Sequence, residues 1–194
     1  MRLDERTIEK IRAWVKQRVG KERYSHILGV EKAAVELGRR YHLNLTPLRA
    51  AALFHDSAKE MSRSQMGSLF RRGPFFLDED EKKIPALWHP HAGANLAYHV
   101  WGCRNREILE AVRCHTLGRP GMGKLAQALF VADYIEPGRS FPGLALARRA
   151  ARTSLAEGVK VKSAQTLDHL VASGRKIHPR LVETWNDFLE LATR

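Results

Sequence analysis

Four ionisable side chains stand at the ends of apolar stretches, where an unpaired charged group is costly. His55 and Asp56 directly follow the apolar residues 50–54, His26 begins an apolar stripe, and Asp133 ends another. Such groups are tolerated in an apolar setting when they are paired or ligate something. Neutral imidazole and carboxylate groups are both good ligands for first-row divalent metals. These four residues are therefore candidate ligands of one metal ion.

Each of these features also has a structural explanation when it is considered alone. A lone histidine on an apolar stripe is more often a core residue bonded to the backbone, and His55-Asp56 could simply end a helix. Adjacent helix positions diverge by roughly 100°, so both side chains can reach one ion only at a helix end or between helices. The ordered occurrence of His, His-Asp and Asp on successive helical segments favours the metal site.

The surrounding pattern is helical nearly throughout the chain. Apolar residues recur at spacings of three and four, and glycine, proline and Asn44 mark the ends of segments. Period-two strand patterns are absent, and residues 78–83 are expected to be solvated surface. We expect one all-α helical bundle over residues 1–194, with helices at about 4–19, 22–41, 44–54, 62–70, 86–101, 105–115, 122–135, 142–156, 163–174 and 179–192.

Composition restricts the class of protein. Hydrophobic residues make up 44% of the 194 residues, which is enough for a core, and no apolar run has the roughly 18 residues that a membrane span needs. The charged N-terminus lacks a secretory signal, and Cys103 and Cys114 follow no metal-binding spacing, so we expect a cytoplasmic protein.

The formal net charge of +12 would attract a nucleic acid, a membrane surface or a phosphorylated small molecule. Lysine and arginine residues are scattered along the chain instead of forming a dense basic tail. We therefore expect a solvated basic surface with no dedicated nucleic-acid or membrane partner. A homodimer is left open by the sequence.

Longer strings around these residues resemble a known family. The strings are RYSHILGVE (23–31), LFHDSAKE (53–60), LWHPHAGA (87–94), HTLG (115–118) and VADYIEPGRSFPG (131–143). They are similar to the YqeK-type HD-domain phosphohydrolases, which are symmetrical bis(5′-nucleosyl)-tetraphosphatases. The resemblance covers about residues 20–182. Residues 67–84 and His91 depart from the family pattern, and His91 leaves two candidates, His89 and His91, for one functional position.

The resemblance implies an HD-domain helical bundle that cleaves diadenosine tetraphosphate into two ADP by attack of a metal-bound water. Iron is the expected metal, with manganese, cobalt and nickel as alternatives. The implied metal ligands are His26, His55, Asp56 and Asp133. A second metal at His89 and His115 is left open, and a single ion is favoured.

The resemblance also assigns further roles. The implied catalytic residues are Asp56, Lys59, His89 and His115. Substrate contacts are implied for Arg23, Lys59, His89, His115, Thr116, Asp133, Arg139, Ile177, His178 and Pro179. Lysine and arginine suit this role because an ammonium gives a point charge and a guanidinium binds phosphate oxygens in pairs. Tyr134 and Glu136 are expected to pack and to cap a helix.

Two other kinds of function remain open at this level. An HD enzyme with another substrate would share the metal chemistry; examples are a 5′-nucleotidase, a cyclic-nucleotide phosphodiesterase and a guanosine-tetraphosphate hydrolase. A non-catalytic nucleotide-binding or RNA-binding module would use the basic charge instead, but the sequence lacks an RNA-binding signature.

Overall fold

The computed structural model describes residue 1 and residues 3–192. Every regular element in this part of the chain is a helix, which confirms the all-α fold. The helices are α1 (Glu5–Lys16), α2 (Lys21–Arg40), α3 (Leu45–Phe54), α4 (Arg63–Arg72), α5 (Glu79–Lys82), the 3-10 helix η1 (Pro85–Leu87), α6 (Trp88–Val100), α7 (Arg106–Cys114), α8 (Lys124–Ile135), α9 (Leu144–Thr153), α10 (Leu155–Ala172) and α11 (Pro179–Ala192).

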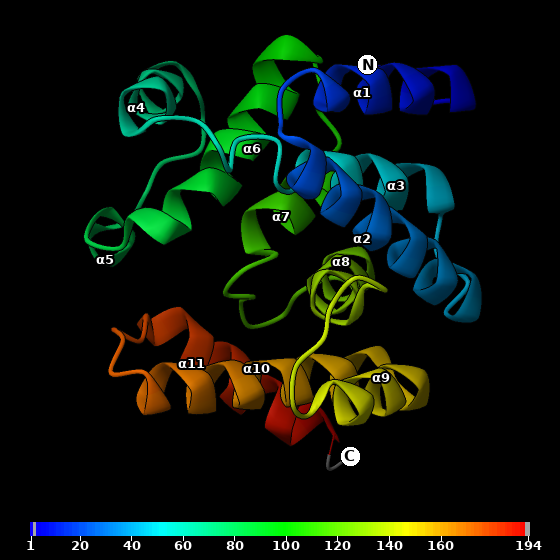
Figure 1. The fold of residues 1–194 in the computed structure, drawn as a ribbon, viewed down its shortest axis with the longest axis vertical. Coiled ribbons are helices and arrows are strands. Elements are labelled where there is room, and N and C mark those ends of the chain that lie inside the picture. Colours follow the sequence, from blue (N-terminus) through cyan, green and yellow to red (C-terminus); the bar gives the residue numbers. More distant parts are fainter. Residues whose placement is uncertain (2, 193–194) are drawn as a thin grey trace.

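The helices form a bundle around α8. Figure 1 shows α1, α2 and α3 at one end of the molecule and α9, α10 and α11 at the other, with α7 and α8 between them. Helix α8 packs against α2 on one side and α10 on the other, and α7 packs against α3, α6 and α8. This arrangement brings segments from the first and last thirds of the sequence to the same helix. No helix in the described residues has the length and apolarity to cross a membrane.

Two helices are buried on most sides. In α3, every residue from Pro47 to Phe54 except Arg49 is buried, as its apolar sequence predicted. Asn44 caps this helix by accepting a hydrogen bond from the backbone of Thr46. Helix α8 buries an unbroken apolar run, Ala128–Ala132. Burial on most sides fixes both helices, so polar residues at their ends are held in defined positions.

The boundary between the ninth and tenth helices differs from the prediction. The sequence predicted helices at 142–156 and 163–174, whereas α9 ends at Thr153 and α10 begins at Leu155. Ser154 terminates one helix and caps the next, because its hydroxyl accepts a hydrogen bond from the backbone of Glu157. The early start of α10 places Lys162 in its middle, facing the core.

The expectation that residues 78–83 are solvated surface is wrong for Glu81. Asp78 caps the short helix α5, and Glu81 is only 2% exposed. The Glu81 carboxylate accepts a hydrogen bond of 2.6 Å from Arg180 and lies 2.8 Å from Nε2 of His91. His178 lies 3.2 Å from Asp78. These contacts tie α5 to α6 and to the start of α11, and they could not be read from the local charge pattern.

Glu81 is expected to contribute to stability in a pH-dependent way. Burial alone would raise its pKa, but His91, the backbone at Asp78 and Arg180 lower the pKa of Glu81 to about 2. A lowered folded-state pKa gives stability that is present above the unfolded pKa near 4.5 and is lost as the pH falls toward 2. We expect Glu81→Gln to reduce the free energy of unfolding by about 2 kcal/mol at pH 7.

Urea unfolding of the parent and the variant from pH 7 down to pH 3 measures this effect. The difference between the two proteins should shrink below pH 4.5. The matched control is Glu79→Gln, because Glu79 lies on the same helix with its side chain 82% exposed. The control should stay within about 0.5 kcal/mol of the parent. A constant difference across the pH range would contradict the assignment.

Candidate metal centre

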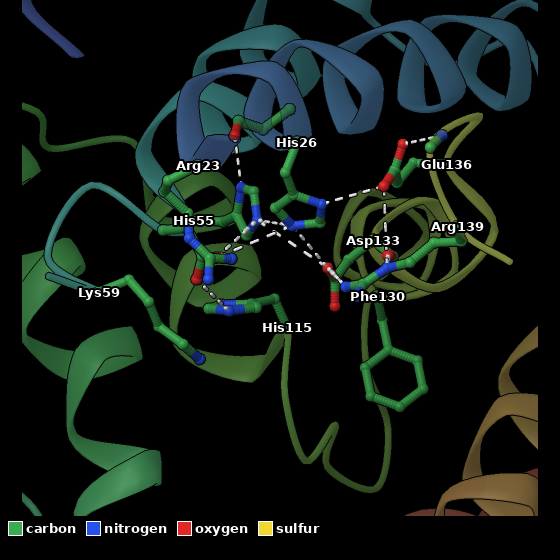
Figure 2. Close-up of polar contacts among 12 residues, drawn as sticks. Arg23, His26, His55, Lys59, His115, Phe130, Asp133, Glu136 and Arg139 are labelled. Carbon is green, nitrogen blue, oxygen red and sulfur yellow. Dashed lines mark hydrogen bonds and ion pairs between the residues drawn. The ribbon is translucent and has the colours of Figure 1, made fainter. Parts of the chain in front are cut away.

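His26, His55 and Asp133 come together where α2, α3 and α8 meet (Figure 2), and Asp56 lies beside the two histidines. His26 lies on α2, His55 ends α3, Asp56 follows it, and Asp133 lies near the end of α8. The Nε2 atoms of His26 and His55 are 3.4 Å apart. Oδ2 of Asp56 lies 3.8 and 3.7 Å from them, and Oδ1 of Asp133 lies 3.2 and 4.0 Å from them. Two imidazoles and two carboxylates thus face one point.

Both imidazoles are fixed through their other nitrogen. Nδ1 of His55 lies 2.6 Å from the carbonyl oxygen of Ala52, and Nδ1 of His26 lies 3.2 Å from the Glu136 carboxylate. Donation from Nδ1 to these acceptors leaves the Nε2 lone pair of each ring free to face the centre. This is the usual way in which a protein orients a metal-ligating histidine.

The charge states also fit a divalent cation. Burial lowers the pKa of His55 to about 4, which favours the neutral imidazole that a metal needs. Burial would raise the pKa values of Asp56 and Asp133, but contacts with His115 and His89 for the first and the charge of Lys162 for the second hold both well below the usual range. Two ionised carboxylates and two imidazoles form a donor set that suits a first-row metal ion. The residues present therefore fit the metal.

A second group of donors lies on the other side of Asp56. His89 begins α6 and His115 ends α7, and their Nε2 atoms are 3.0 Å apart. These nitrogens lie 3.2 and 3.5 Å from Oδ1 of Asp56, whose other oxygen faces His26 and His55. The carboxylate of Asp56 is therefore shared by the two groups, and each group contains three residues that could hold an ion.

Three histidine rings make the same local contact with a backbone carbonyl. His55, His89 and His115 each place Nδ1 within 2.6–2.8 Å of the carbonyl oxygen three residues earlier in the chain. Each ring is therefore anchored to its own helix end and presents Nε2 to Asp56. The repetition shows how three helix ends can converge on one carboxylate without a long loop.

Cationic side chains line the same centre. Arg23 donates a hydrogen bond of 2.7 Å to Asp56, and Arg139 donates one of 3.1 Å to Asp133. Nζ of Lys59 lies 3.2 and 3.1 Å from the two ring nitrogens of His89. Burial lowers the pKa of Lys59, and burial lowers the pKa of His89 to about 3. Three cations from three segments thus surround the carboxylates.

The remaining predicted residues lie farther along one side. Thr116 follows His115 directly, and Ile177, His178 and Pro179 precede or begin α11. A cavity of about 360 Å³ is lined by Ala86, Leu117, Lys176 and His178, among others. Ala86 supplies the carbonyl that holds His89, so this cavity adjoins the His89 side of the centre. Ile177 and Pro179 line a neighbouring cavity with His178.

A third group of potential ligands, Asp78, Glu81 and His178, has a different character. The guanidinium of Arg180 already binds both carboxylates of this group. A cation from the chain thus occupies the position that a metal would take. The group is a structural ion-pair network.

The structure also separates His89 from His91. His89 faces Asp56 and His115, whereas His91 pairs with Glu81 on the far side of α6.

Two further residues, which the sequence analysis did not assign to the centre, also contact it. Glu136, expected only to cap, also holds His26, and Lys162 lies 3.3 Å from Asp133. Glu136 stands in the VADYIEPGRSFPG string, which was the available signal; Lys162 has none.

Comparison with known proteins agrees with this geometry. The HD domain family matches residues 23–138. A symmetrical bis(5′-nucleosyl)-tetraphosphatase from Bacillus subtilis is 36% identical over 92% of this chain and 95% of that protein. One of the same name from Halalkalibacterium halodurans is 33% identical over 90% of this chain and 93% of that protein.

A solved structure shares the whole fold. The crystal structure of an HD superfamily hydrolase from Clostridium acetobutylicum, described as involved in NAD metabolism, superposes with a TM-score of 0.88. The two chains are 31% identical, and the match covers 94% of this chain and 96% of the other. The chain therefore belongs to the HD domain family and, within it, to the YqeK-type branch that its motifs resemble.

Proposed function

We propose that this protein is a metal-dependent hydrolase that cleaves diadenosine tetraphosphate symmetrically into two molecules of ADP. The observation that carries the proposal is the convergence of two histidines, two aspartates and three cations on one centre beside a cavity. The names of the Bacillus and Halalkalibacterium relatives support the same substrate.

His26, His55, Asp56 and Asp133 would hold the divalent metal. When bound there, such an ion lowers the pKa of coordinated water and neutralises charge on phosphate oxygens. The mixed imidazole and carboxylate donors suit iron, and also manganese, cobalt and nickel. We propose iron as the metal on the basis of the family resemblance.

The chain's own residues would bind and orient the polyphosphate. Arg23 and Arg139 carry guanidinium groups that can bind phosphate oxygens in pairs once they exchange their present carboxylate partners. His89 and His115 present Nε2 atoms toward the same place and would contact the phosphates there. Asp56, held between the two histidine groups, would fix the direction from which water approaches.

Lys59 would act on the leaving ADP. Its ammonium contacts His89 and is largely removed from water, which lowers its pKa and makes it a better proton donor. A positive charge at this position stabilises the negative charge that develops on the leaving phosphate oxygen. The cavity lined by Leu117, Lys176 and His178 would take one nucleoside half of the substrate, with Thr116, Ile177 and Pro179 nearby.

We also propose that residues 1–194 work as one domain in the cytoplasm. Helix α10, outside the matched residues 23–138, contributes Lys162 to the centre, which supports one cooperative unit. Cys103 and Cys114 are buried and unpaired, as thiols are in a reducing compartment. A homodimer and the absence of a nucleic-acid partner stay predictions.

Product analysis tests the proposed function. Protein loaded with iron, manganese or cobalt is incubated with diadenosine tetraphosphate, and the nucleotides are separated by chromatography. Cleavage between the two central phosphates gives ADP as the only product. Formation of ATP and AMP would overturn symmetrical cleavage. Absence of turnover with all three metals, together with hydrolysis of a cyclic nucleotide or a nucleoside monophosphate, would favour another HD activity.

A further inference from the structure

Lys162 is a buried cation that no predicted role includes. It lies in the middle of α10 and is 4% exposed. Its ammonium donates hydrogen bonds to the carbonyl oxygens of Phe130 at 2.6 Å and His115 at 3.0 Å, and to Oδ2 of Asp133 at 3.3 Å. An ammonium has three N–H bonds, so all of them have a partner. The charge also lies 3.8 Å from the centre of the Phe130 ring.

The cost of this burial calls for an explanation. Removing an ammonium from water costs several kcal/mol, and an apolar side chain of similar length would fill the same space without that cost. The partners of Lys162 are not scattered through the core. Two of the three acceptors belong to Asp133 and His115, which come from the two donor groups on either side of Asp56.

The contact with Lys162 gives the two carboxylate oxygens of Asp133 different partners. Lys162 takes Oδ2, while Oδ1 lies 3.2 Å from Nε2 of His26 and faces the centre. Rotation of the carboxylate would break one of these contacts. A carboxylate held in this way can offer one fixed oxygen to an ion. The nearby ammonium of Lys162 stabilises the negative charge of the carboxylate.

The contact with His115 acts on the other donor group. The carbonyl of His115 is at the end of α7, where the last carbonyls of a helix have no partner within the helix. Lys162 supplies that partner, and the ring of the same residue points to Asp56. One side chain from α10 therefore sets the distance between α7 and α8.

We propose that Lys162 is a positioning residue of the metal centre, which fixes Asp133 as a one-oxygen ligand and sets the spacing between Asp133 and His115. This inference rests on the proposed metal site. It predicts that loss of the ammonium weakens metal binding in protein that is still folded. A residue needed only for core packing would change the unfolding temperature and leave the metal affinity of the folded protein unchanged.

The test is a titration of metal-free protein with Mn²⁺, followed by electron paramagnetic resonance, at a temperature where circular dichroism shows each variant to be folded. Lys162→Met removes the charge and all three hydrogen bonds. Lys162→Gln keeps an N–H donor for a carbonyl and removes the charge. The matched control is Lys160→Met, because Lys160 lies on the same helix and pairs with Glu157.

We expect Lys162→Met to bind Mn²⁺ about 10–100-fold more weakly than the parent, as is typical when a residue that orients a ligand is lost. Lys162→Gln should lie between the two, and Lys160→Met should match the parent. At saturating Mn²⁺, kcat should fall in Lys162→Met and be partly restored in Lys162→Gln.

His55→Gln separates failure of this inference from failure of the proposed site. Unchanged Mn²⁺ affinity in His55→Gln would show that the metal is not held at this centre. Weak binding in His55→Gln with parent-like affinity in Lys162→Met would overturn the positioning role alone. Failure of both Lys162 variants to fold would also overturn the positioning role, since Lys162 would then be needed for the fold itself.

Discussion

Replacing His55 with glutamine is expected to remove the bound metal and to reduce turnover of diadenosine tetraphosphate by at least about 10³-fold. His55 is fully buried, and its Nε2 atom is one of four donors that face a single point. An amide is a much weaker ligand than an imidazole for a first-row metal. Without the ion, the activation of water that lowers its pKa from about 15.7 to about 7 is lost.

Elemental analysis of the purified protein and a product assay measure the two effects together. The matched control is His91→Gln, which removes another buried imidazole and keeps a donor for Glu81. The control should retain the metal and most of its activity, because His91 points away from the centre. Equal loss of metal in both variants would mean that the effect comes from disturbed packing, and retained metal in His55→Gln would contradict the assigned site.

The grouping of these four side chains could be anticipated because His55, Asp56 and Asp133 follow apolar stretches and His26 begins one. The residues before His55 and Asp133 are buried on most sides, so their helices can lie only in the core, and the polar group at each end must be satisfied there. A short connection joins α2 to α3, and α8 packs against both of them. Local sequence thus carried most of the information on these positions.

Contacts between distant segments could not be anticipated in the same way. The pair His26–Glu136 joins residues 110 positions apart, and the pair Glu81–Arg180 joins residues 99 apart. Glu81 stands in a run of charged residues, where exposure is the normal expectation, and it is buried by contacts with α6 and α11. The position of Lys162 could not be anticipated because the helix predicted at 163–174 started too late, although Ser154 and Glu157 have the spacing of a helix cap.

Replacing His115 with alanine is expected to leave the tightly bound metal in place and to reduce turnover by about 10²–10⁴-fold. His115 lies 3.5 Å from Oδ1 of Asp56, on the side of that carboxylate away from His26 and His55. The four donors on the other side stay intact in this variant. Loss of the imidazole would remove a group that contacts the polyphosphate beside Asp56.

The same variant distinguishes one ion from two. His89, His115 and Asp56 are close enough to hold a second ion, and two ions that share a carboxylate are common in phosphate hydrolysis. Lys59 argues for the single ion, because its ammonium already lies 3.1 Å from Nε2 of His89, and a second cation there would meet that charge at short range. The single-ion arrangement requires one equivalent of metal in the parent and one in His115→Ala. Two equivalents in the parent that fall to one in His115→Ala would establish the two-ion centre and give Lys59 a different place in the bound state.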